Sequence, residues 1–113
     1  MHRISVDTNE HADVVTASGE LDAFVADDLT NAFRDVAPSE RVLVDLTAVS
    51  FMDSTALGLL MRAVREADSR GRIMRIVLPD GTGRRIFEIT TLDRVLPVAE
   101  SRLAALAELE AGD

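Results

Sequence analysis

Between residues 41 and 78 the sequence switches between two kinds of hydrophobic spacing. Residues 41–46 form a short β-branched run that is typical of a strand covered on both faces. Apolar residues then recur at Leu57, Leu60, Met61 and Val64, which is the i, i+3, i+4, i+7 spacing of one helical face. A further strand is predicted over residues 73–78. This order predicts a helix packed against a sheet.

The N-terminal part of the chain adds two strands and another helix. The strands are predicted over residues 4–6 and 14–17, and the segment 18–20, Ser-Gly-Glu, is predicted to end the second. A helical face follows, and Pro38 lies beyond its end. Its apolar positions are Val25, Leu29, Phe33 and Val36.

The C-terminal part continues the alternation after the predicted strand at 73–78. We expect a short helix over residues 82–89, a brief edge strand over 95–98 and a closing helix over 101–110. The whole order predicts an α/β fold with a mixed sheet of four to five strands and about four packed α-helices.

Composition excludes several classes of protein. A chain of 113 residues, 47% of them apolar, fits one domain. The absence of cysteine excludes disulfides, thiolate metal sites and cysteine nucleophiles. A net charge of −8 disfavours direct binding to nucleic acid or anionic lipid and favours a partner with a basic docking face. Since no signal-peptide core or membrane-length apolar stretch is present, we expect a cytoplasmic protein.

The segment 49–58, which joins the strand at 41–46 to the following helix, contains the candidate site. Asp53 and Ser54 are both good N-cap residues, so the helix is predicted to begin at one of them and to stop before Gly71. Local chemistry alone favours a simple helix cap over a functional serine. A phosphate on Ser54 would nevertheless be favoured by the helix N-terminus and repelled by nearby carboxylates such as Asp53 and Asp22.

Three blocks of the sequence stand out together: Gly19-Glu20-Leu21-Asp22, then Val44-Asp45-Leu46, then Ser50-Phe51-Met52-Asp53-Ser54-Thr55-Ala56-Leu57-Gly58. These blocks resemble the anti-sigma factor antagonists, which are single STAS domains of bacterial transcription regulation. Their spacing and the predicted order of elements agree with the family from about residue 4 to residue 109. The resemblance implies a STAS fold and a single STAS domain over residues 1–113.

The resemblance also implies a partner-switching mechanism. The unmodified antagonist binds an anti-sigma factor, which is a serine kinase, and so frees a sigma factor. The kinase then phosphorylates the serine that follows the motif's aspartate, here Ser54, and a serine phosphatase restores the active form. The protein is then a substrate and a ligand, not an enzyme, and it needs no cofactor. The expected partner-binding residues are Asp22, Asp53, Ser54, Thr55, Ala56 and Leu59.

Several of these assignments leave two interpretations open. Asp22 is as compatible with a helix N-cap as with a partner contact, and Thr55 could be a second phosphate acceptor. Ala56 stands where many members of the family carry glycine, so its methyl group could hinder a partner's close approach. Leu59 lies off the main apolar face of its helix and is either an exposed contact or covered by a neighbouring helix.

Two alternative functions are compatible with parts of the sequence. The first is a STAS scaffold or accessory subunit in which Ser54 is only a cap. The second is a receiver-type domain phosphorylated on Asp45, although no acidic pair follows the strand at residues 4–6 to hold Mg²⁺.

Two further patterns do not indicate a ligand site. Residues 81–85, Gly-Thr-Gly-Arg-Arg, lack the ending of a nucleotide loop. His2 and His11 lie in polar surroundings near the N-terminus, and they suggest neither a metal site nor a base for Ser54.

Overall fold

The computed structural model describes residues 2–8, 12–36, 38–78, 98–99 and 101–111. The elements in these ranges are β1 (Arg3–Thr8), β2 (Asp13–Leu21), the 3₁₀ helix η1 (Ala23–Val25), α1 (Ala26–Val36), β3 (Arg41–Met52), α2 (Ser54–Ser69), β4 (Ile73–Val77), β5 (Val98–Ala99) and α4 (Arg102–Ala111). None of the described helices combines the length and hydropathy needed to cross a membrane.

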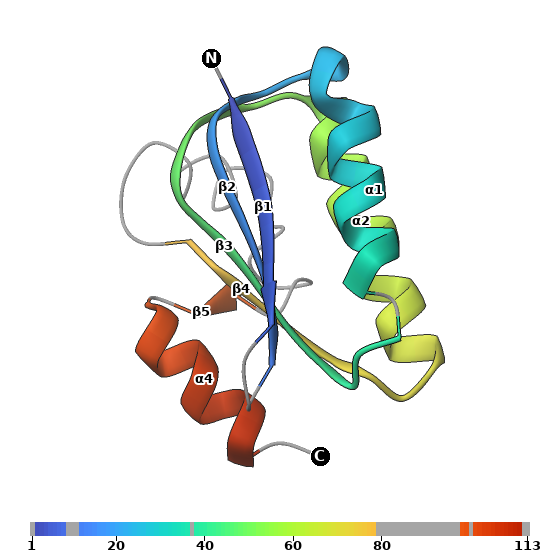
Figure 1. Ribbon diagram of the computed structural model, residues 1–113, viewed down its shortest axis with the longest axis vertical. Helices are drawn as coiled ribbons and strands as arrows, with labels where there is room; N and C mark the ends of the chain where they lie inside the picture. The colour runs from blue at the N-terminus through green and yellow to red at the C-terminus, as the bar shows by residue number, and fades with distance from the viewer. Residues whose placement is uncertain (1, 9–11, 37, 79–97, 100, 112–113) are drawn as a thin grey trace.

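The strands form one five-stranded mixed sheet in the order β1-β2-β3-β4-β5. β1 is antiparallel to β2, as a short connection between them allows, while every other neighbouring pair is parallel. The predicted mixed sheet of four to five strands is confirmed. Because β2 and β3 are parallel, their carboxyl ends lie at the same edge of the sheet, where α1 and α2 begin (Figure 1).

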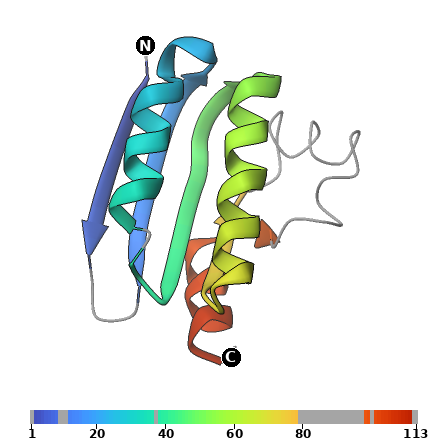
Figure 2. The same cartoon turned by 90° about the vertical axis from the view of Figure 1, so that its right-hand side faces the viewer.

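The helices lie on both faces of the sheet. Figure 2 shows α1 and α2 side by side across one face, with α4 against the other. β3 contributes side chains to the hydrophobic clusters on both faces of the sheet. Val42 and Val44 pack beneath α1 and α2, whereas Leu43 packs in the cluster that contains α4. This two-sided burial explains why the run at residues 41–46 is apolar at consecutive positions instead of alternate ones.

An ion pair joins α4 to the middle of the sheet. Asp45 of β3 is 6% exposed and accepts hydrogen bonds from Arg102 Nε at 3.0 Å and Nη2 at 2.8 Å. Its other oxygen accepts from the backbone N–H of Thr47 at 2.9 Å. Burial acts to raise the pKa of Asp45, but the hydrogen bonds from Thr47 and Arg102 outweigh it, so the pKa lies below its usual value.

Three strands run further than the sequence predicts, and the first of them, β1, covers Arg3–Thr8 instead of residues 4–6. β2 continues through residues 18–20 to Leu21, so the predicted end of the strand there was wrong; the register shifts between Thr16 and Ser18 and between Gly19 and Glu20. Gly19 has a φ of +81°, which a residue without Cβ adopts at little cost, and such irregularities let pairing continue past a local break. β3 likewise extends beyond residue 46 to Met52.

The predicted helix after the motif segment is confirmed at both ends. α2 begins at Ser54 and ends at Ser69, and Gly71 follows with a φ of +69°. The N–H of Arg72 then donates to the carbonyl of Ala67 at 2.8 Å, which closes the helix end. The predicted helix at 82–89 and residues 95–97 of the predicted edge strand lie outside the described residues.

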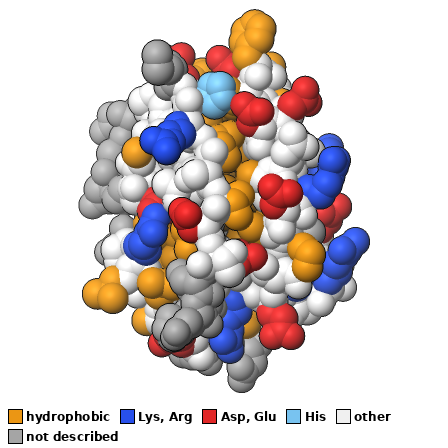
Figure 3. All heavy atoms as spheres, in the orientation of Figure 1, with side chains coloured by type: hydrophobic (Ala, Val, Ile, Leu, Met, Phe, Trp, Pro, Cys, Tyr) orange, Lys and Arg blue, Asp and Glu red, His pale blue; other side chains and the backbone are white. Residues whose placement is uncertain are grey.

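An apolar seam remains visible between β1 and α1 (Figure 3). The hollow there measures about 540 Å³, and Ile4 and Val6 of β1 line it with Asp28 and Asp35 of α1. Both apolar residues are only half-buried because β1 is the outermost strand described on this side of the sheet.

Candidate functional site

Two aspartates that are distant in the sequence lie at one edge of the sheet. Leu21, the last residue of β2, pairs with Met52, the last residue of β3, and each is followed by an aspartate and then a helical segment. The N–H of Asp53 donates to the carbonyl of Leu21 at 3.0 Å, which ties the two strand ends together. Asp22 and Asp53 are therefore brought together by the parallel register of β2 and β3.

Each of these aspartates caps the helical segment that follows it. The side chain of Asp53 accepts a hydrogen bond from the N–H of Ala56 at 3.0 Å, from an extended backbone with φ −92° and ψ 179°. The side chain of Asp22 accepts from the N–H of Phe24 at 2.9 Å at the start of η1. The N-cap interpretation of both residues is confirmed, and the caps hold both carboxylates at the helix starts.

Ser54 is the first residue of α2, and both Ser54 and Thr55 are exposed. Neither hydroxyl forms a hydrogen bond with another residue in the described part of the chain. The backbone N–H groups of a helix's first turn have few intrahelical partners and carry the positive end of the helix dipole. The Ser54 hydroxyl is therefore accessible, and an anion attached to it would lie in a favourable field.

The other two expected partner contacts lie elsewhere. Ala56 is only 1% exposed and packs into the core beneath α2, so the expectation that its methyl group faces a partner was wrong. The reason is helical geometry, because Ala56 lies in line with Leu60 and Ala63 on the face turned toward the sheet. Leu59 is half-buried in the groove between α1 and α2, which agrees with the alternative that a neighbouring helix covers it.

Two exposed phenylalanines lie within two residues of the capping aspartates in the sequence and were not singled out from it. Phe24 is 94% exposed beside Asp22, and Phe51 is 47% exposed two residues before Asp53. The sequence did carry a signal for Phe24. It is a large apolar residue that falls outside the helical spacing begun by Val25, so it could have been expected to stay outside the core. Exposed aromatic side chains beside polar groups are typical of docking surfaces, because large rings supply contact area at a low cost in conformational entropy. We call Asp22, Phe24, Phe51, Asp53, Ser54 and Thr55 the switch surface.

The structure disfavours Asp45 as a phosphate acceptor. Its carboxylate is buried and hydrogen-bonded to Arg102 and Thr47, so it has no open approach from which to attack a phosphoryl donor. Asp45 is a structural residue that anchors α4.

No metal-ligating cluster of three or more His, Cys, Asp or Glu side chains occurs among the described residues. His2 contacts Asp28 at 3.0 Å on the surface. His11 and the loop at residues 81–85 lie outside the described part of the chain.

Comparison with known proteins assigns the chain to a class. The family model of the STAS domain matches residues 3–105. The chain belongs to the STAS domain family.

Individual relatives narrow the resemblance within this family. The anti-sigma-B factor antagonist of Listeria monocytogenes is 36% identical over 93 residues, which cover 79% of each protein. The structure of an anti-sigma factor antagonist from Mycobacterium paratuberculosis superposes with a TM-score of 0.89 at 25% identity, covering 97% of this chain and 95% of that one. The resemblance to anti-sigma factor antagonists is thereby confirmed.

A third protein, SpoIIAA, shares the fold and has been solved in two states. Its unphosphorylated form superposes with a TM-score of 0.79 at 17% identity, covering 98% of this chain and 99% of that one. The phosphorylated form, described as a Bacillus cell fate determinant, has a TM-score of 0.69 at 18% identity over 88% of this chain and 91% of that one.

Proposed function

We propose that this protein is a cytoplasmic anti-sigma factor antagonist that is switched by phosphorylation of Ser54. In the unphosphorylated form the switch surface binds an anti-sigma factor that is also a serine kinase, and a sigma factor is released. Phosphorylation of Ser54 dissociates this complex, and a serine phosphatase restores the binding form. The observation that carries the proposal is an exposed serine hydroxyl at the start of α2, beside two capping carboxylates.

The local electrostatics favour a switch that changes binding without unfolding the helix. A phosphate on Ser54 adds about −1.5 to −2 charges at neutral pH. The N-terminus of α2 stabilises such a group by roughly 0.3–1 kcal/mol at an exposed position. Asp22 and Asp53 repel it, as does any apolar or acidic partner surface. A binding loss of about 2 kcal/mol corresponds to roughly a thirtyfold loss of affinity.

The switch surface also supplies attraction for the unmodified state. Phe24 and Phe51, each within two residues of a capping aspartate in the sequence, offer exposed apolar area. Asp22 and Asp53 complement a basic docking face, in agreement with the net charge of −8. The protein acts as a substrate in this scheme, because the kinase supplies ATP and the catalytic groups. The whole chain, residues 1–113, acts as one STAS domain.

The test is incubation with the cognate kinase and ATP, followed by mass spectrometry of the digested protein. We expect one phosphate on Ser54 in the wild type and in Thr55→Ala, and none in Ser54→Ala. In a pull-down, Ser54→Ala should retain the kinase, whereas Ser54→Asp should bind at least tenfold more weakly.

Two outcomes would overturn the proposal. Phosphate on another residue, or on none, would remove Ser54 from its role. Equal binding by Ser54→Ala and Ser54→Asp would instead favour a STAS scaffold in which the serine only begins a helix.

A further inference from the structure

A groove between α1 and α2 is lined by several positively charged side chains, although the protein as a whole is acidic. All of the chain's 12 basic residues are arginines, and four of them line this groove. One glutamate joins them, which leaves the groove a formal net charge of +3 in a chain whose total is −8. These charged residues are Arg34, Arg62, Glu66, Arg70 and Arg72.

The attraction of arginines to helix C-termini explains the positions of only some of these residues. Cations are favoured at helix C-termini, which explains Arg34 in the last turn of α1 and Arg70 at the C-cap of α2. Arg62, by contrast, projects from the middle of α2, and Arg72 lies beyond the end of the helix. No ion pair joins Arg34, Arg62 or Arg70 to another residue in the part of the chain that the structure describes.

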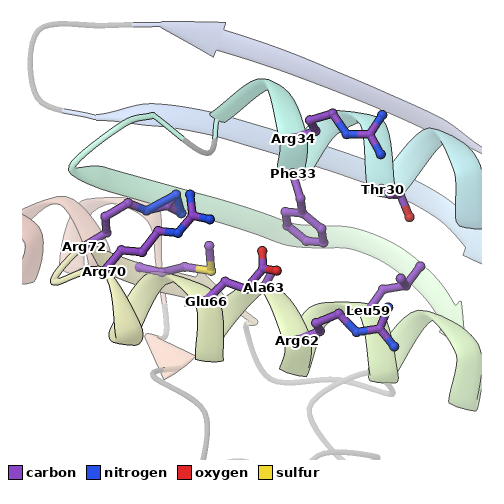
Figure 4. Close-up of a pocket in the computed structure, with 10 residues that line it drawn as sticks. Thr30, Phe33, Arg34, Leu59, Arg62, Ala63, Glu66, Arg70 and Arg72 are labelled. Atoms are coloured by element: carbon purple, nitrogen blue, oxygen red, sulfur yellow. The ribbon is translucent and has the colours of Figure 1, made fainter.

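Two of the guanidinium groups lie side by side at one end of the groove. Figure 4 shows Arg70 and Arg72 extending together, with the carboxylate of Glu66 turned toward the same space. Burial and the charge of Arg70 lower the pKa of Arg72, while Glu66 acts in the opposite direction. The planar guanidinium group of an arginine can bind a carboxylate, sulfonate or phosphate group with two parallel hydrogen bonds, so this end of the groove suits an acidic group.

The floor of the groove is apolar. Phe33 projects from α1 toward α2 (Figure 4), and Leu59, Ala63 and Met74 complete the surface beneath it. The volume is about 430 Å³, which falls in the range of about 300–1,000 Å³ that is typical of small-molecule sites. The groove thus combines an aromatic and aliphatic floor with cations along its length and at one end.

We propose that the α1–α2 groove binds a small organic anion that has an apolar, planar body and one or two acidic groups. The acidic group contacts Arg70 and Arg72, and the apolar body lies on Phe33 and Met74. Arg62 adds a second contact along α2. This site lies apart from the switch surface and does not depend on the function proposed for it.

The test uses a pair of fluorescent probes of similar shape and opposite charge character. The probes are 1-anilinonaphthalene-8-sulfonate, which is anionic, and N-phenyl-1-naphthylamine, which is neutral. We expect the sulfonate to bind the full-length protein at one site and to shift the backbone amide resonances of Ala63, Glu66 and Met74 in ¹⁵N-correlation spectra. We expect the amine to bind at least tenfold more weakly.

Three variants assign the charge contacts. Arg70→Gln and Arg62→Gln should each weaken sulfonate binding, by about tenfold and about threefold, while leaving the weak binding of the amine unchanged. Arg65→Gln is the matched control, since Arg65 is exposed on the same helix but does not line the groove. It should change the affinity by less than twofold. Arg70 and Arg62 are both exposed, so their replacement is compatible with folding, which thermal unfolding would verify.

The proposal fails if the sulfonate does not bind, or if its resonance shifts map to the seam between β1 and α1. It also fails if Arg65→Gln weakens binding as much as Arg70→Gln, because the effect would then reflect overall charge. Equal affinity for the two probes would show an apolar surface without anion selectivity and would likewise overturn it.

Discussion

Replacing Arg102 by methionine tests how α4 is attached to the sheet. The substitution keeps much of the aliphatic length but removes the two hydrogen bonds of 3.0 and 2.8 Å that Arg102 donates to Asp45. Breaking a fully buried pair costs roughly 3–5 kcal/mol, because one charge stays behind without compensation. The Arg102 side chain is 48% exposed, so water replaces part of the loss, and we expect a decrease of about 2 kcal/mol in the free energy of unfolding.

The assay is urea denaturation at pH 7, followed by circular dichroism. Asp45→Asn and the double variant complete a double-mutant cycle, and contacting charged residues should give a coupling energy of about 1 kcal/mol or more. Arg65→Met is the control, and at an exposed position it should stay within about 0.5 kcal/mol of the wild type. A loss for Arg102→Met no larger than that of the control would refute the reasoning.

The same variant should weaken the pH dependence that Asp45 contributes. In the wild type the pKa of Asp45 is lowered, since hydrogen bonds from Thr47 and Arg102 overcome the effect of burial. The contribution to stability is therefore complete above the ordinary value of 3.8 and is lost as the pH falls through the folded-state pKa. Without Arg102, burial and the Thr47 hydrogen bonds remain but the hydrogen bonds and charge of Arg102 are lost, so the pKa of Asp45 should rise relative to the wild type. The stability difference between the variant and the wild type should therefore shrink on acidification.

Other substitutions give simpler expectations. Asp53→Ala removes the cap of α2 and should lower the free energy of unfolding by about 1 kcal/mol in thermal unfolding experiments. Ala56→Gly deletes a buried methyl group within a helix and should cost about 1–2 kcal/mol in urea denaturation, while pull-down of the anti-sigma factor stays unchanged because the methyl faces the core. In Gly71→Ala the added Cβ meets no atom within 4 Å, but the alanine must adopt a φ of +69°. A decrease of about 1 kcal/mol in the free energy of unfolding, measured by the same assay, would therefore reflect backbone strain alone. Phe24→Ser should leave stability within about 0.5 kcal/mol at a side chain that is 94% exposed, yet weaken kinase binding severalfold in a titration.

The secondary structure follows closely from local spacing, and the exceptions are instructive. The helix α2 and its ends were predictable because periodicity, N-cap residues and Gly71 all act within a few residues of one another. Its predicted apolar face was only partly right, since Leu60 and Val64 are buried but Leu57 and Met61 stay half-buried. The end of β2 was placed too early because residues 18–20 look like a turn in isolation. In the folded protein they stay in the sheet, since irregular pairing with β3 supplies their hydrogen bonds.

The sequence predicted which residues belong to the candidate site but not how they are arranged in space. The motif blocks pointed to Asp22, Asp53 and Ser54, and the parallel register of β2 and β3 then brought the two aspartates to one edge of the sheet. Ala56 was misplaced because its inward direction depends on how α2 is rotated on the sheet. Phe24 was missed because only the packed structure shows how much of its side chain remains exposed.

The sequence by itself determined the order of the described helices and strands and placed the serine at the start of a helix, because hydrophobic periods and caps operate over one or two turns of chain. Only the tertiary structure decided which distant side chains meet. Arg102 reaches Asp45 across 57 positions of sequence, and α1 and α2 bring together the arginines of their shared groove. Such contacts depend on strand register and on which face of the sheet each helix covers, and neither is encoded in the spacing of neighbouring residues.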